Sequence, residues 1–141
     1  MYSLLIMKKI IAIIEKGTDG GYSIYAADGL PLFSNGMTEQ EARDDFQNCV
    51  NEQARYIKEH TGKYPDWFDE NGIDIDYRYD MTAFFLAFPF INVSELAKTI
   101  GINPSLMRKY KSGIAKASQK QKDLIQHKFD DMISRLSVVK F

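Results

Sequence analysis

The stretch NVSELAKTIGINPSLMRKYKSG, residues 92–113, predicts two short helices joined by a tight turn. Asn92 is a residue type that caps helix N-termini, and Gly101 accepts the left-handed backbone conformation in which many helices end. Asn103 followed by Pro104 then begins a second helix, because proline at the first helical position gives up no hydrogen bond. Two helices that cross at a short glycine-containing turn are typical of a helix-turn-helix unit.

The apolar residues of this stretch predict which helix faces are buried. Leu96, Ala97 and Ile100 share one face of the first helix, and Met107 and Tyr110 share one face of the second. The other positions of the second helix put polar and basic residues on or beside its outer surface: Ser105, Arg108, Lys109 and Lys111. An ordinary αα-hairpin in a helical bundle would explain the caps, but not the glycine turn, the outer face and the local charge together.

The formal charge of the chain is −1, but it is divided unevenly along the sequence. Residues 1–91 contain 8 basic and 15 acidic side chains, a balance of −7, and residues 92–141 contain 10 basic and 4 acidic, a balance of +6. The C-terminal part therefore suits a polyanion, whereas the N-terminal part suits a basic partner. The alternative is that the C-terminal helices simply have lysine-rich, solvated surfaces.

Length and composition indicate two small domains, which we expect at residues 1–79 and 80–141. The single cysteine, Cys49, excludes an internal disulfide framework, favours a reducing compartment and is expected on a helix face. The apolar run that follows Lys8 and Lys9 is too short for a membrane span and has no cleavage site. We therefore expect a soluble, cytoplasmic protein with no membrane partner. Residues 1–6 are either an upstream start, with Met7 as the true first residue, or an extension of the first strand.

The N-terminal part predicts three strands, a helix and a further strand, so the whole chain is expected to be α+β. The strands are expected at KKIIAIIEKG, at residues 22–26 and 32–34, and at IDIDYRYD, with a hairpin turn at Gly20 and Gly21. Thr38 and Glu41 form a capping box for a helix that ends at Gly62. Its inner face is expected to hold apolar residues at helical spacing: Ala42, Phe46, Cys49, Val50, Ala54 and Ile57.

We find no catalytic pattern and predict neither an enzyme nor a cofactor. Glu15 and Asp28 could lie near a sheet edge, and Asp74 and Asp76 share one face of their strand, but nothing further joins them into a two-metal site. The two histidines, His60 and His127, have no nucleophile paired with them in the sequence. We therefore predict no metal site, although a vestigial metal-dependent nuclease tethered to DNA is an alternative.

Residues 91–113, INVSELAKTIGINPSLMRKYKSG, resemble the second and third helices of lambda-repressor-like (XRE-type) DNA-binding domains. The preceding YDMTAFFLAFPFI provides a short first helix that ends at Pro89. The following ASQKQKDLIQHKFDDMISRL begins with a capping box, Ser118 with Gln121, and is expected to cover the back of the unit with a set of apolar residues: Leu124, Ile125, Phe129, Ile133 and Leu136.

Residues 8–53 are similar to the opening of HicB-like antitoxins, in which a strand, a Gly-Tyr turn, a second strand, a G.T..EA pattern and a helix follow in this order. The matching residues in this chain are Gly21, Tyr22, Gly36, Thr38, Glu41 and Ala42. The resemblance implies a partial ribonuclease H fold without its active site, followed by a DNA-binding domain. In such proteins the front domain neutralises a small, basic, HicA-like toxin that cleaves mRNA, and the back domain represses the toxin-antitoxin operon.

Together these observations predict a non-enzymatic antitoxin of a type II toxin-antitoxin system that also represses its own operon. By the resemblance, the residues expected to contact DNA are Asn92, Ser105, Arg108, Lys109, Lys111 and Lys116. Lys111 and Lys116 are assigned to phosphates, Ser105 and Lys109 to base edges, and Arg108 to either. The acidic balance of the front domain suggests toxin contacts at Glu15, Asp19 and Asp28.

A homodimer or a higher even oligomer is expected, because one such domain reads few base pairs and a two-fold operator requires two copies. An alternative function is a ligand-sensing transcriptional repressor, unrelated to a toxin, whose front domain binds a small molecule through its aromatic residues.

Overall fold

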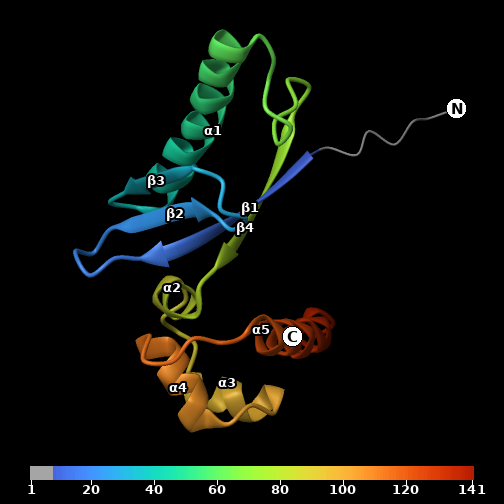
Figure 1. Ribbon diagram of the computed structural model, residues 1–141. Coiled ribbons are helices and arrows are strands. Elements are labelled where there is room, and N and C mark those ends of the chain that lie inside the picture. Colours follow the sequence, from blue (N-terminus) through green and yellow to red (C-terminus); the bar gives the residue numbers. More distant parts are fainter. Residues whose placement is uncertain (1–7) are drawn as a thin grey trace, which may run out of the picture. The chain divides into compact units, whose positions relative to one another are not determined.

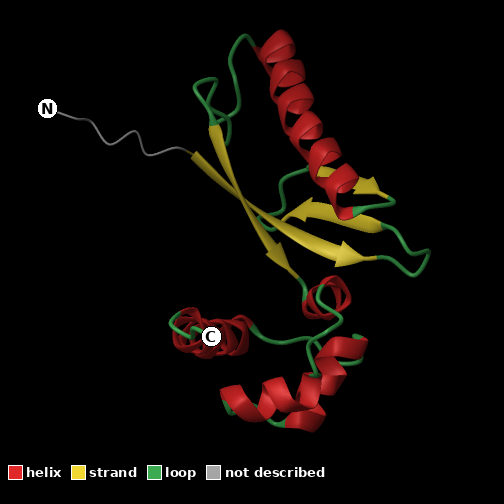
Figure 2. Ribbon diagram, turned by 180° about the vertical axis from the view of Figure 1, so that it is seen from behind, coloured by secondary structure: helices red, strands yellow, loops and turns green. Residues whose placement is uncertain are grey.

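The computed structural model describes residues 8–141, which form two units, unit 1 up to Asp80 and unit 2 from Met81 to Phe141. The protein is α+β, with a four-stranded mixed sheet and five helices (Figures 1 and 2). Residues 1–7, with the question of the start codon and of a strand extension, lie outside the described part. None of the helices in the described residues is long and apolar enough to cross a membrane.

Unit 1 contains the sheet and one long helix. Its elements in chain order are β1 (Lys8–Lys16), β2 (Tyr22–Ala26), β3 (Phe33–Gly36), α1 (Glu39–Thr61) and β4 (Ile73–Tyr79). The strand order is β3-β2-β1-β4, in which β1 pairs antiparallel with β2 and parallel with β4. The predicted chain order of elements is confirmed, except that the third strand covers residues 33–36 instead of 32–34.

The core of unit 1 lies between α1 and one face of the sheet (Figure 1). On β1 and β2 the buried residues alternate, as expected for strands with one covered face: Ile10, Ala12, Ile14, Ile24 and Ala26. Four of the six residues predicted for the inner face of α1 are buried: Ala42, Phe46, Val50 and Ala54. Cys49 and Ile57 are only half-buried, because they lie at the margins of that face.

The turn between β1 and β2 differs from the predicted two-glycine hairpin. It covers residues 17–21 and is closed by the Gly17 N–H, which donates to the Gly21 carbonyl over 2.7 Å. Only Gly20 has a positive φ, of 90°, because the Asp19 carboxylate accepts a hydrogen bond from the Gly21 N–H and completes the turn.

The start of α1 is capped by Thr38 as predicted, but the return bond of Glu41 goes to Met37, one residue before the N-cap. The Thr38 hydroxyl accepts from the Glu41 N–H over 3.1 Å, and the Glu41 carboxylate accepts from the Met37 N–H over 3.0 Å. The helix ends at Gly62, whose φ of 87° lies in the left-handed region. Residues with a β-carbon are strained in this conformation, so glycine is favoured here.

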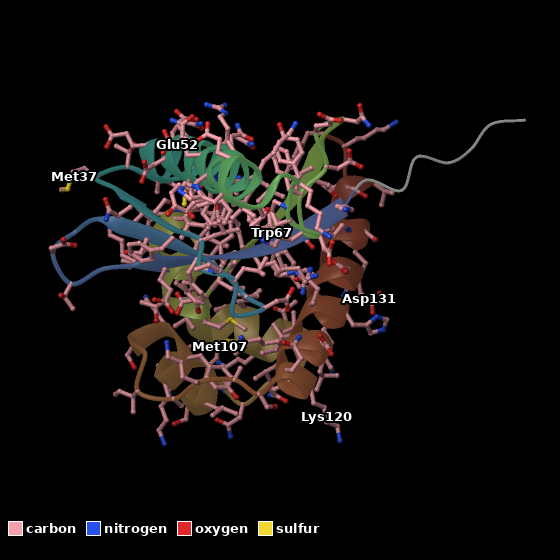
Figure 3. All side chains as sticks on the ribbon, turned by 45° about the horizontal axis from the view of Figure 1, so that its top comes forward. Met37, Glu52, Trp67, Met107, Lys120 and Asp131 are labelled. Carbon is pink, nitrogen blue, oxygen red and sulfur yellow. The ribbon has the colours of Figure 1, made fainter. Side chains whose placement is uncertain are left out.

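Unit 2 consists of four helices, α2 (Met81–Ala87), α3 (Val93–Ile100), α4 (Pro104–Ser112) and α5 (Gln119–Ser137). Their small core holds one or more residues from every helix: Phe85, Leu96, Ala97, Ile100, Ile102, Met107, Tyr110 and Ile125. The predicted inner faces of α3 and α4 are therefore confirmed. In Figure 3 the Met107 side chain lies among these helices, whereas Lys120 extends away from α5.

The prediction that α5 covers the back of unit 2 with five apolar residues is wrong for three of them. Ile125 is buried and Phe129 half-buried, but Leu124, Ile133 and Leu136 are 42, 47 and 58% exposed. For Ile133 and Leu136 the reason is length: the 19 residues of α5 span about 28 Å, and the 8 residues of α3 only about 12 Å. The C-terminal half of α5 therefore carries apolar residues that this core does not cover.

Replacing Gly36 by alanine should destabilise unit 1 by roughly 1–3 kcal/mol. A β-carbon at this position would lie 2.6 Å from the Ala42 nitrogen and 2.9 Å from the Glu41 carbonyl carbon, so the backbone at the start of α1 would have to shift. The free energy of unfolding can be measured by urea titration with the fluorescence of Trp67, the only tryptophan of the chain.

Asn35→Ala is the matched control, because Asn35 is the exposed neighbour of Gly36 on the same strand. It should lower the free energy of unfolding by no more than about 0.5 kcal/mol. Equal losses for the two variants would contradict the close approach of β3 and α1.

Candidate nucleic-acid interface

One face of α4 consists of exposed polar and basic side chains. Ser105, Arg108, Lys109 and Ser112 are exposed and recur at helical spacing, on the side opposite the buried Met107. Ser112 belongs to this face by its distance of seven residues from Ser105, a spacing that is visible in the sequence and that the prediction missed. The face presents hydroxyl, guanidinium and ammonium groups, which can donate hydrogen bonds to the phosphates and bases of nucleic acids.

The turn between α3 and α4 fixes how the two helices lie to each other. Gly101 has a φ of 75°, and its N–H donates to the Lys98 carbonyl, while the Ile102 N–H donates to the Ala97 carbonyl over 2.8 Å. This is the Schellman arrangement, in which Ile102 continues into the core, where it is buried. The Asn103 side chain then accepts from the Leu106 N–H over 3.1 Å and begins α4.

Two of the residues predicted to contact DNA have side chains engaged at the start of α3. The Asn92 side chain is its N-cap and accepts from the Glu95 N–H over 3.0 Å. The Arg108 Nη1 donates to the Ser94 hydroxyl over 2.8 Å, so the guanidinium of α4 is held beside the first turn of α3. Ser94 could not be predicted from the sequence, because this contact crosses between helices. One bond engages one of the five N–H donors of the guanidinium.

The two lysines predicted to contact phosphates flank the α4 face instead of lying on it. Lys111 is exposed one turn after the buried Met107, and Lys116 is exposed in the segment between α4 and α5. Residues 101–118 contain four basic side chains, Arg108, Lys109, Lys111 and Lys116, and no acidic one. The net positive charge of unit 2 is therefore concentrated around α4, where it would attract a polyanion.

Unit 1 keeps the acidic balance of −7, because residues 81–91 contain no charged side chain. Of the three acids predicted to contact a toxin, Glu15 accepts a hydrogen bond from the Tyr25 hydroxyl over 3.1 Å. Asp19 lies in the turn before β2 and Asp28 in the turn after it, and both are exposed. The structure therefore places Asp19 and Asp28 at opposite ends of β2 and does not gather the three acids into one cluster.

The acids considered for a metal site are engaged with neighbouring side chains. Asp74 lies 3.8 Å from the Lys9 ammonium, and Asp76 accepts from Arg78 over 2.9 Å. Within residues 8–141 no three histidine, cysteine, aspartate or glutamate side chains lie close enough together to hold a metal ion.

A half-buried polar cluster that the sequence did not predict ties α1 to β4. The Tyr79 hydroxyl donates to the Glu39 carboxylate over 2.8 Å, and the Arg43 Nε donates to the same carboxylate over 3.0 Å. Burial raises the pKa of Tyr79, and the hydrogen bond to Glu39 raises it further. The spacing of Glu39 and Arg43 on one helix is visible in the sequence. Their contact with Tyr79 is not, because Tyr79 lies 40 positions after Glu39.

Comparisons of the chain with protein-family models, with curated proteins and with solved structures find no match.

Tyr25 should ionise far above the usual pH, because burial and the adjacent Glu15 carboxylate raise its pKa from 10.0 to about 12. The raised pKa means that the protonated hydroxyl stabilises the fold below pH 10, and that this contribution is lost as the pH rises from 10 to 12. A titration of tyrosinate absorbance should show a late phase, from which Tyr25→Phe should remove the absorbance of one tyrosine.

Glu15→Gln should move that late phase toward lower pH, because the charge that opposes ionisation of Tyr25 is gone. A late phase of unchanged position in Glu15→Gln would show that the contact between these two residues does not form in solution.

Proposed function

We propose that this protein is an antitoxin that binds DNA, in which unit 2 represses the antitoxin's own operon and unit 1 neutralises a small basic ribonuclease toxin. The observation that carries the DNA-binding half is the exposed α4 face within a segment, residues 101–118, that holds four basic side chains and no acidic one. Helix-turn-helix proteins present such a helix to the major groove of DNA.

In this proposal α4 is the recognition helix. Its first turns point at base edges, so Ser105 and Lys109 read bases, while Lys111 and Lys116 flank the groove and meet phosphates. Arg108 is held by Ser94 at the start of α3, which supports a backbone contact over a base contact. The Asn92 side chain is engaged in capping α3, so its role is to orient the first turn of that helix towards a phosphate.

Lys109→Ala and Lys116→Ala should weaken DNA binding in different ways. Loss of a base contact at Lys109 should cost roughly 1–3 kcal/mol on the operator and reduce discrimination against a scrambled duplex. Loss of a phosphate contact at Lys116 should weaken binding to both duplexes equally and lower the salt slope by about one. Titration of both duplexes at several salt concentrations measures the two effects.

Lys120→Ala is a matched control, because Lys120 is an exposed lysine that lies outside the 101–118 segment, at the start of α5. Operator affinity that is unchanged in both Lys109→Ala and Lys116→Ala would contradict the assignment of α4 as the reading helix.

The toxin-binding half of the proposal rests on the resemblance of residues 8–53 to HicB-like antitoxins and on the charge of unit 1. The chain order of three strands, a helix and a strand, on which the likeness to a partial ribonuclease H fold is based, is present in unit 1. An excess of seven acidic side chains would attract a basic protein and speed its association.

Charge reversal on unit 1 should slow association with a basic toxin encoded beside the antitoxin gene. Because Asp19 and Asp28 lie at opposite ends of β2, Asp19→Lys and Asp28→Lys should slow association to different extents. The variant with the stronger effect should associate about tenfold more slowly at low salt, and the difference from the wild type should disappear at high salt. Glu52→Lys on the exposed side of α1 (Figure 3) makes the same charge change elsewhere on unit 1.

The association rate is measured by stopped-flow mixing and the biological effect by growth of cells that express both proteins. Equal slowing by all three variants would mean that only overall charge matters and that neither turn is part of the toxin-binding surface. Failure of the wild-type protein to bind the toxin would refute this half of the proposal.

A further inference from the structure

Unit 2 contains an apolar groove of about 460 Å³ that none of its own residues covers. Its walls are α2 with the following loop, α3, and the C-terminal half of α5, and most of its lining is aromatic or aliphatic: Phe84, Phe88, Phe90, Phe129, Ile133 and Leu136. Phe90 is 84% exposed at the edge of the groove. The segment 81–91, which forms one wall, contains no charged residue.

The chain continues from this groove into an apolar C-terminal tail. Val138, Val139 and Phe141 directly follow α5 and are exposed. Unit 2 therefore presents an apolar hollow and, beside it, an apolar projection. A surface with both features can bind a second copy of itself around a two-fold axis, because each copy supplies the projection that the other accommodates.

We propose that this groove is the surface through which two copies of the chain associate, with the end of α5 and the tail of each copy lying in the groove of the other. The exposed apolar side chains that this would bury are Phe90, Ile133, Leu136, Val138, Val139 and Phe141. At about 100 Å² each they provide roughly 600 Å² per copy, close to the 800 Å² per partner of a stable interface once polar neighbours are added.

Charge at the groove and on the tail is complementary. The one acidic residue that lines the groove is Glu95, whose side chain is 69% exposed and lies 3.4 Å from Lys98. The one charged residue of the tail is Lys140, between Val139 and Phe141. A tail that enters the groove of a second copy would bring Lys140 towards Glu95 twice in the dimer, which favours this occupant.

Another occupant, a small apolar ligand, would fill the hollow but would leave the adjacent tail residues exposed. The inference does not rest on the proposed function, because the groove, the tail and their charges are independent of DNA and of a toxin.

The test is the mass of the full-length protein in solution without DNA, measured by sedimentation velocity over a range of concentrations. The wild-type chain should sediment as a dimer of twice 16.2 kDa. Ile133→Gln combined with Leu136→Gln should raise the dimer dissociation constant by at least about 30-fold, because two apolar side chains at the centre of the interface are lost. Neither change alters the charge, and glutamine is compatible with a helix.

Leu124→Gln is the matched control, since Leu124 is a similarly exposed apolar residue of α5 that does not line the groove. It should leave the dimer intact, and circular dichroism should show the same helix content in all variants. A monomeric wild type, a dimer that survives the double change, or equal dissociation in the Leu124→Gln control would each overturn the proposal.

Reversal of the charge pair tests the tail directly. Lys140→Glu and Glu95→Lys should each raise the dissociation constant of the dimer. In the combined variant opposite charges meet again, so at least half of the increase in the logarithm of the dissociation constant should be reversed. Additive weakening in the combined variant would overturn the placement of the tail in the groove.

Discussion

The turn at Gly101 is the constraint on which the arrangement of unit 2 depends. Its left-handed backbone allows Ile102 to return to the core while its hydrogen bonds satisfy the last carbonyls of α3. Once Ile102 is buried, α4 has to begin at Asn103 and Pro104, and the burial of Met107 then fixes which side of α4 faces solvent. A side chain at residue 101 would be strained in this conformation, so both the packing of α3 on α4 and the exposed basic face follow from one glycine.

Opposite charges on the two units separate two kinds of partner. The net charge of −1 would attract neither acidic nor basic partners. Each unit nevertheless has its own electric field at distances below the Debye length, because unit 1 has a balance of −7 and unit 2 a balance of +6. Because residues 81–91 are uncharged, the change of sign coincides with the boundary between the units. This division suits a protein that binds a polyanion with one unit and a basic protein with the other.

The small size of unit 2 explains why apolar residues remain on its surface. Four helices, of which three have fewer than ten residues, bury eight side chains, and most of the apolar positions of the longer α5 lie beyond that core. Helices gain most of their stability from packing of an apolar face, so a half-covered α5 favours association with a further surface. The polar contacts of unit 1 show the opposite case, in which Tyr79, Glu39 and Arg43 satisfy one another within the unit.

Local features of the chain were readable from the sequence because they depend on neighbouring residues. The caps at Thr38, Asn92 and Asn103, the ends at Gly62 and Gly101, and the period of buried residues along each helix and strand all follow from spacings of two to four positions. Contacts between distant segments followed no such spacing: the parallel pairing of β1 with β4, the bond from Arg108 to Ser94, and the Tyr25 hydroxyl on Glu15 are set by how elements pack. For the same reason the sequence predicted an apolar face on α5 correctly and its burial wrongly, since periodicity shows which side of a helix is apolar, and only the dimensions of the neighbouring helices decide how much of that side is covered.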